Sequence, residues 1–364
     1  MTTSTLTPAV SVLMVVRDEP SPRLQRAVDA VARQVGVGPV ELLIAAPGDE
    51  HARISALRPS GAIETMLVVE NPDGSRSAGL NAALAAARAS VVARVDARSR
   101  LTSDYLTRCL GRLEADPSVG VVGAIQRPDA GGDGVVARGV ARALRNPYFM
   151  GGARYRRPGA GGPADTAYLG AFRRAELQDM GGFDERLAAN EDFELCARYR
   201  ARGAVVWVEH SLEVTYEARA TLRDLWRQYR SLGAGKADYW RHHGSRPNGR
   251  QTAALVAPVA VIGALGLATR RPAAAVAATA AGIVGLAVVD HVIAPRERDP
   301  RVRAVSLGAA ITLTGAWVSG VLGGVTRGRG ARPCVESGGD TSRDQPRQST
   351  SSGRAGAPGM SSMR

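Results

Sequence analysis

Residues 10–20 read VSVLMVVRDEP, and this stretch decides the fold. Residues 10–16 are almost entirely apolar, rich in valine and without a helical period, so they predict a strand that is covered on both faces. A dinucleotide-binding domain would continue with Gly-x-Gly-x-x-Gly, whereas this chain continues with Arg17, Asp18, Glu19 and Pro20. The stretch therefore predicts an α/β sheet and disfavours a dehydrogenase.

Strands and helices alternate along the chain that follows. The pattern predicts helices over 22–34 and 77–89, and strands over 40–45, 63–69 and 90–95. Strand and helix in turn form a Rossmann-like, mostly parallel sheet, which binds ligands outside the carboxyl ends of its strands. We therefore expect the functional residues of this α/β domain to follow its strands.

The composition fits one large domain or two ordinary ones. The 364 residues are 45% hydrophobic, and the three cysteines are too few and too far apart for a disulfide framework or a metal knuckle. The formal net charge of +13 would suit nucleic-acid binding, but no nucleic-acid recognition motif is present and Lys236 is the only lysine. We expect no nucleic-acid partner.

The last third of the chain contains three long stretches without a charged residue. They cover 252–269, 273–289 and 304–325, and each approaches the roughly 20 residues that cross a bilayer. The stretches predict about three transmembrane helices, whose small residues permit close packing in lipid. Three buried helices of a soluble bundle are the alternative, because the stretches are rich in Ala and Gly.

These patterns divide the chain into five parts. They are a disordered N-terminus (1–8), the α/β domain (9–220), an amphipathic membrane-interface segment (221–250), a transmembrane region (251–325) and a disordered tail (326–364). The basic loop 296–303 favours the cytosolic side, and if all three stretches span, the α/β domain lies there too. We expect a multi-pass protein of the cell membrane with a cytoplasmic α/β domain.

Four short motifs follow one another along the α/β domain. They are Ser-Ala-Gly-Leu-Asn-Ala-Ala at 77–83, Arg-Val-Asp-Ala-Arg at 94–98, Gly-Gly-Phe-Asp-Glu at 181–185 and Asn-Glu-Asp-Phe-Glu-Leu at 190–195. In order and spacing they resemble family 2 glycosyltransferases, especially the bacterial membrane-linked glucosyltransferases of succinoglycan biosynthesis. The resemblance covers about residues 10–236. It implies a GT-A fold, a nucleotide-diphosphate sugar donor, a divalent metal and an inverting single displacement.

The resemblance assigns the catalytic base to Asp192, with Glu191 beside it. An inverting transfer needs one base within hydrogen-bonding distance of the acceptor hydroxyl. The alternative is that these two acids only complement the dipole of a helix that starts here. The family's acceptor-binding loop, in which glycines let the backbone approach a sugar closely, corresponds to Gly181, Gly182, Phe183 and Asp184.

Asp96 stands where the family has the first carboxylate of its metal motif. A carboxylate suits a hard ion such as Mg²⁺ or Mn²⁺. The chain departs from the family at the second position of the motif, because Arg98 replaces the usual carboxylate or histidine and cannot coordinate a cation. Either Asp96 alone anchors the metal, or Arg98 itself contacts the diphosphate.

The donor is expected to bind at the loops and helix starts that follow the strands. Arg76 precedes a helix N-terminus, which favours anions. Ala46 occupies the place of the Asp that commonly holds the nucleotide base, and Asp18, Glu19 and Asp49 are the candidates to replace it, with a UDP-sugar as the expected donor. The full set of expected donor-binding residues is Arg17, Glu19, Arg76, Asn81 and Arg98.

Together these patterns predict an inverting hexosyltransferase of exopolysaccharide or cell-envelope glycan synthesis. It would move a sugar from a nucleotide-diphosphate donor to a hydroxyl of a lipid-linked or polysaccharide acceptor. The alternative is a non-catalytic, sugar-nucleotide-binding membrane subunit of a glycan-assembly complex, which the replacements Ala46 and Arg98 favour.

Overall fold

The computed structural model describes residues 7–256 except 148 and 151, residues 297–326, and a few positions between 271 and 288. The chain divides into two units, 1–331 and 332–364, and all described residues belong to the first unit. Most of the predicted N-terminal segment 1–8, of the stretch 252–269 and of the tail 326–364, and about half of the stretch 273–289, lie outside the described residues.

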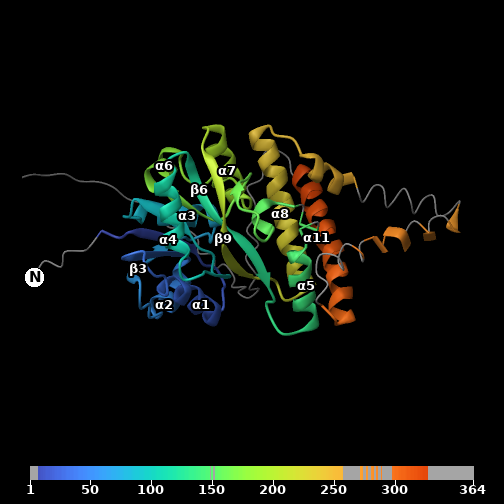
Figure 1. The fold of residues 1–364 in the computed structure, drawn as a ribbon, viewed down its shortest axis with the longest axis horizontal. Coiled ribbons are helices and arrows are strands. Elements are labelled where there is room, and N and C mark those ends of the chain that lie inside the picture. The colour runs from blue at the N-terminus through green and yellow to red at the C-terminus, as the bar shows by residue number, and fades with distance from the viewer. Residues whose placement is uncertain are drawn as a thin grey trace, which may run out of the picture. The chain divides into compact units, whose positions relative to one another are not determined.

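One mixed sheet forms the centre of the described chain (Figure 1). Four parallel strands lie side by side in the order β3, β2, β1, β4, followed by β8, β6, β9 and β5, with β7 paired to β9. β8 runs antiparallel to both β4 and β6, whereas β6 and β9 are parallel. The strands are β1 (Val10–Val15), β2 (Val40–Ala46), β3 (Ile63–Glu70), β4 (Val91–Arg94), β5 (Ser99–Arg100), β6 (Val119–Asp129), β7 (Gly162–Pro163), β8 (Tyr168–Arg173) and β9 (Val205–Glu217).

Helices cover both faces of this sheet. On one face the core is formed with α1 (Ser21–Ala32), α2 (Gly48–Ser55) and α4 (Tyr105–Ala115), and on the other with α3 (Arg76–Ala86), α6 (Arg174–Asp179) and α7 (Glu191–Ala201). Side chains alternate along β1, so Val12 and Met14 enter the first core and Leu13 the second. The strand and helix predictions up to residue 95 are confirmed, and the burial of all of β1 except the partly exposed Val15 explains the almost entirely apolar run with which the fold begins.

Three further helices pack together beside the sheet: α5 (Val135–Arg145), α8 (Leu222–His243) and α11 (Pro300–Thr326) (Figure 1). A short 3₁₀ helix, η1, covers Arg154–Arg156. α11 and α8 approach closely through glycines, since a Cβ atom on Gly320 would lie 2.0 Å from the Arg230 carbonyl and one on Gly233 would lie 2.1 Å from the Trp317 carbonyl.

Of the three expected membrane helices, the described residues contain one candidate. α11 is long and apolar enough to cross a bilayer, but nearly half of its most apolar part is buried within the protein. The stretch 304–325 is therefore helical as expected, and it also packs on the 221–250 segment, most of which forms α8. The other two spans stay predictions.

Candidate active site

The site forms where the start of α7 meets the carboxyl end of β4. Asn190 precedes α7 in the left-handed conformation, with φ of 67°, and its Nδ2 donates a hydrogen bond to the Leu232 carbonyl of α8 at 3.0 Å. This turn places Glu191 and Asp192 in the first turn of α7. β4 ends at Arg94, and Asp96 follows two residues later on the same side of the extended chain.

A buried ion-pair network joins these two elements. Nη1 of Arg94 lies 3.0 Å from Oε1 of Glu191, and its Nε lies 3.0 Å from Oδ1 of Asp96. Arg76, at the start of α3, reaches the same Glu191 oxygen at 3.5 Å. The predicted metal ligand, one predicted donor ligand and the predicted acid pair therefore share a single cluster.

Charge within the cluster keeps its acids ionised. Burial alone would raise the pKa of Glu191, but Arg76 and Arg94 hold that pKa below its ordinary value. Burial would also raise the pKa of Asp96. The charges of Arg94 and, to a smaller extent, Arg76 outweigh burial and lower the pKa of Asp96 below its ordinary value. Both carboxylates are anions at neutral pH.

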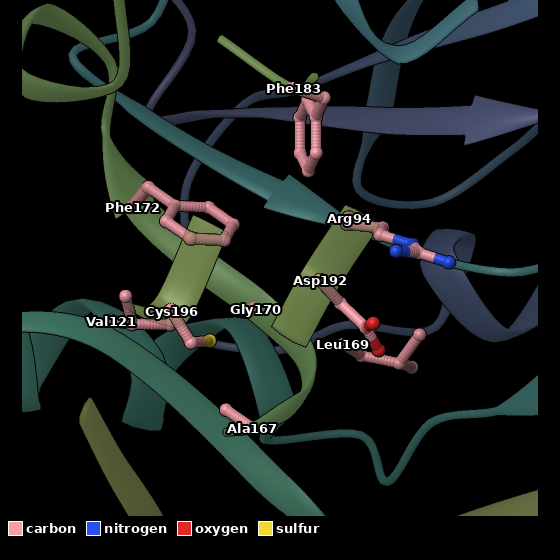
Figure 2. Close-up of a pocket in the computed structure, with 9 residues that line it drawn as sticks. All are labelled: Arg94, Val121, Ala167, Leu169, Gly170, Phe172, Phe183, Asp192 and Cys196. Atoms are coloured by element: carbon pink, nitrogen blue, oxygen red, sulfur yellow. The ribbon is translucent and has the colours of Figure 1, made fainter. Parts of the chain in front are cut away.

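Asp192 has a different environment. It lines a cavity of about 10 Å³, near the least volume that holds one water molecule, together with Arg94, Leu169, Phe172 and Cys196. Figure 2 shows Asp192 and Arg94 on one side of this cavity, with Phe172 and Cys196 on the other. Burial and then the Glu191 charge raise the pKa of Asp192 above its ordinary value. Adjacent acids with oppositely shifted pKa values are typical of acid–base sites.

Asn81 holds the predicted acceptor loop. Its Oδ1 accepts a hydrogen bond from the Phe183 N–H at 2.8 Å, and its Nδ2 donates to the Phe183 carbonyl at 2.9 Å. Gly182, with φ of +70°, lies against the same amide, and a Cβ atom there would stand 2.4 Å from Asn81 Oδ1. Asn81 and the loop 181–184 are thus brought together, and the donor contact expected of Asn81 stays a prediction.

Two of the predicted donor ligands, Glu19 and Arg98, form an ion pair with each other in the loops that follow β1 and β4. β1 and β4 are neighbours, which places Glu19 and Arg98 side by side, with Oε1 of Glu19 3.1 Å from Nε of Arg98. Arg17 lies apart from them, and its guanidinium donates to the Asp73 carbonyl in the loop after β3 at 3.0 Å. Ala46 ends β2, and Glu50 of α2 accepts a hydrogen bond from the Asp18 N–H at 3.0 Å.

Asp184 belongs to a second acidic group with Glu194 and His243. Their ligand atoms lie within 4.8 Å of one another, the spacing of a possible cation site. Both carboxylates are already engaged, since Arg186 lies 2.7 Å from Asp184 and Arg198 lies 2.7 Å from Glu194. Guanidinium groups thus occupy the place of a cation, and the donor set fits an ion-pair cluster better than a metal centre.

Sequence reasoning missed two residues of the site. Arg94 opens the motif at 94–98, which assigns it no role, although its position two residues before Asp96 indicates a shared face of the chain. Lys236 is buried in α8 with its Nζ 3.2 Å from the centroid of the Phe193 ring, next to Asp192. No local pattern marks Lys236, apart from its being the only lysine.

The mixed, mostly parallel sheet with helices on both faces is that of the GT-A fold. The predicted resemblance to family 2 glycosyltransferases is confirmed, because residues 11–180 match the family model described as glycosyl transferase family 2. The acid pair of α7 lies beyond the matched segment.

One relative in sequence and one solved structure illustrate what the chain resembles. It is 29% identical over 258 residues to the succinoglycan biosynthesis protein ExoA of Rhizobium meliloti (strain 1021), covering 70% of this chain and 76% of that protein. The mannosyltransferase PcManGT from Pyrobaculum calidifontis, solved in complex with GDP-Man and Mn²⁺, superposes with a TM-score of 0.51 over 88% of each chain at 18% identity. The second likeness supports the fold alone.

Proposed function

We propose that this chain is a membrane-associated, inverting hexosyltransferase of exopolysaccharide or cell-envelope glycan synthesis. It would take a sugar from a nucleotide-diphosphate donor, with a UDP-sugar expected, to a hydroxyl of a lipid-linked or polysaccharide acceptor. One observation carries the proposal: Arg94 joins Asp96 to Glu191, directly beside Asp192. The similarity to a succinoglycan biosynthesis protein supports the type of product.

Asp192 would act as the general base. As the acceptor oxygen forms its bond to the anomeric carbon, the hydroxyl proton passes to the Asp192 carboxylate. The bond between the anomeric carbon and the diphosphate oxygen breaks, and its electron pair leaves with the nucleoside diphosphate. A base is most effective when its pKa lies near the working pH, and burial with the Glu191 charge moves Asp192 in that direction.

Cationic groups would receive the departing diphosphate. Arg76 stands at the start of α3, and its side chain is 52% exposed, so it can turn toward a phosphate while Arg94 still holds Glu191. The helix N-terminus adds its own preference for anions. Arg98 is half-buried against Glu19 and would exchange this ion pair for a phosphate contact.

Asp96 fits a metal as a single carboxylate ligand. Its side chain is 34% exposed, and a metal would have to displace Arg94 from one of its oxygens, since Nε and Nη2 of Arg94 contact Oδ1 and Oδ2 at 3.0 and 3.4 Å. Mg²⁺ in phosphate sites is commonly held by one or two carboxylates together with phosphate oxygens, so one carboxylate can suffice. A Mg²⁺ or Mn²⁺ ion held by Asp96 would neutralise charge on the leaving group. PcManGT, which resembles this chain in fold, was solved in complex with Mn²⁺.

The substitution Asp192→Asn tests the base. We expect the rate of nucleoside diphosphate release, measured with a donor panel and lipid-linked acceptors, to fall by about 100- to 10,000-fold. Donor affinity should change little. Asp133→Asn, at an exposed loop position, is the control and should keep the wild-type rate. Wild-type turnover in Asp192→Asn would refute the assignment, and donor binding without any turnover by the wild type would favour the non-catalytic subunit.

Chelation of divalent ions separates the two predicted ways of neutralising the diphosphate. If Asp96 holds a metal, EDTA stops turnover and added Mn²⁺ restores it, and Asp96→Asn raises the Mn²⁺ concentration needed for half the maximal rate. If turnover instead survives EDTA, Arg98 acts alone, and Arg98→Met lowers the rate. The measurement is initial rate against free metal concentration for the three proteins.

A further inference from the structure

Arg219 is a half-buried guanidinium that follows β9 and has no partner among the described residues. Its Nε atom is buried and makes no hydrogen bond within that part of the chain. No carboxylate there forms an ion pair with it, and the next acid along the chain, Asp224, lies 3.1 Å from Arg227 instead. Native structures give almost every buried polar atom a partner in protein, water or a ligand. An arginine in this state therefore points to a group that binds it.

The fold places Arg219 at the edge of the sheet where β1 and β4 end. β9 is parallel to β6, and β6 and β4 are both antiparallel to β8, so β9 ends at the same edge as β4 and its parallel neighbour β1. The Glu217 N–H donates to the Arg98 carbonyl at 2.8 Å, and the Ala218 N–H donates to the Asp129 carbonyl at 2.9 Å. Arg219 is the next residue. Ligands of such sheets bind outside the carboxyl ends of the strands.

Arg98, at the same edge, can leave its ion pair without leaving an acid unpaired. Glu19 contacts Arg98 at 3.1 Å through Oε1 and Arg23 at 2.7 Å through Oε2. Arg23 is itself fixed by Glu217, whose Oε1 lies 2.5 Å from its Nη2. Loss of one partner from a half-buried ion pair is costly when the other charge is left alone. Here Arg23 stays on Glu19, so Arg98 is free to turn toward a ligand.

Positive charge exceeds negative charge in this network. Arg26 also pairs with Glu217, at 3.1 Å, so three arginines already share Glu19 and Glu217, and Arg219 is a fourth. Burial and then the charge of Arg98 lower the pKa of Arg219 from its ordinary value. An arginine nevertheless stays protonated in a protein. The fold thus brings two guanidinium groups toward each other, which an anion between them would stabilise.

We propose that Arg98 and Arg219 together form a diphosphate clamp, which holds the leaving group of the donor. A guanidinium donates two parallel hydrogen bonds to phosphate oxygens, and two such groups reach the diphosphate from the ends of different strands. Arg98 stands where the family has the second carboxylate of its metal motif, so the clamp supplies positive charge at a position that otherwise serves a metal. Arg23 is a positioning residue, because it acts through Glu19. The inference rests on the proposed function for its ligand.

Inorganic pyrophosphate tests the clamp without any turnover. It is titrated by calorimetry into the full-length, detergent-purified protein in EDTA, so that no metal contributes to binding. Arg219→Met and Arg98→Met should each raise the Kd about 10- to 100-fold, because each removes charged hydrogen bonds to phosphate. Arg219→Lys should raise it less, since lysine keeps the charge and loses the fork. Arg26→Met removes one arginine from the same network and is the matched control, which should keep the wild-type Kd.

Thermal unfolding separates ligand binding from a structural role. Arg219→Met removes a buried N–H that has no partner among the described residues, so the variant without ligand should melt at the wild-type temperature or above it. Pyrophosphate should raise the melting temperature of the wild type, and that of Arg219→Met by less. A structural arginine would give the opposite pattern, with a lower melting temperature in the variant and an unchanged Kd for pyrophosphate.

Four results would overturn the inference. They are a wild-type Kd in Arg219→Met, equal losses of affinity in Arg219→Met and Arg26→Met, no pyrophosphate binding by the wild type, and unchanged pyrophosphate affinity with weaker binding of Arg219→Met to phosphatidylglycerol vesicles. Failure of the proposed function looks different. Asp192→Asn should bind pyrophosphate as the wild type does, and a protein that binds pyrophosphate through Arg219 but transfers no sugar would refute the proposed function alone.

Discussion

Arg94 is a buried guanidinium between two carboxylates, and its loss should be costly. The Glu191 side chain is 2% exposed, and without Arg94 its nearest cation is Arg76 at 3.5 Å. Removing one partner of a buried ion pair typically costs about 3–5 kcal/mol, because the other charge stays buried. We therefore expect Arg94→Met to lower the free energy of unfolding by about this amount and to abolish transfer, as measured by denaturant unfolding and by nucleoside diphosphate release.

Two further variants identify the cause of that loss. Arg94→Met combined with Glu191→Leu leaves no buried unpaired charge, so it should recover most of the stability and none of the activity. Arg100 lies a few residues after Arg94 in the chain, and its ion pair with Asp129 is exposed. Arg100→Met removes this exposed pair and should cost less than about 1 kcal/mol. A double variant as unstable as Arg94→Met would show that packing, and not charge, explains the effect.

At the residue scale, the sequence identifies side chains whose expected role follows from their place at the end of a strand or the start of a helix. Asp96 follows the end of a strand, and Asp192 lies at the start of a helix. Both positions can be recognised in the sequence. Arg94 and Lys236 obtain their surroundings from other elements, because the fold brings Glu191 to Arg94 and Phe193 to Lys236. A single sequence contains no signal for such pairings.

Between elements, the contact of α8 with α11 depends on small residues. A Cβ atom on Gly320 would lie 2.0 Å from the Arg230 carbonyl, whereas one on Gly323 would meet nothing within 4 Å. Gly320→Ala should therefore separate the helices and cost about 1–3 kcal/mol despite its better helix propensity. Gly323→Ala is the matched control and should be neutral or stabilising by up to about 1 kcal/mol. Thermal unfolding in detergent measures both, and equal melting temperatures would contradict the close packing.

The elements themselves were predictable where periodicity is strong. The strand 40–45 appears as Val40–Ala46 and the helix 22–34 as Ser21–Ala32, because one is apolar throughout and the other has a clear apolar face. The antiparallel β8 was not predicted, because its direction depends on pairing with β4 and β6. The stretch 304–325 predicts an apolar helix equally well for lipid or protein surroundings, and α11 has one face against protein.

For the whole molecule, the outer face of α11 bears on how the proposed enzyme would reach a lipid-linked acceptor. Ile311, Leu322 and Val325 are exposed large apolar residues, and their spacing of 11 and 3 places them on one side of the helix. The opposite side, including Leu313 and Ala316, packs against α5 and α8. Exposed apolar side chains aligned along a helix are costly in water and favourable in lipid, which predicts that this face contacts the bilayer.

Site-specific fluorophores test that contact whichever other segments reach the membrane. In a Cys334→Ser background, where the remaining Cys109 and Cys196 are buried, single cysteines at Ile311 and Leu322 would carry an environment-sensitive label in phosphatidylethanolamine and phosphatidylglycerol vesicles. We expect quenching by brominated lipid and protection from aqueous iodide, because the labels lie in hydrocarbon. Val35 and Leu67, exposed apolar residues of the α/β domain, are the controls and should show the reverse. Equal iodide quenching at Ile311 and Val35 would place the outer face of α11 in water and contradict this prediction.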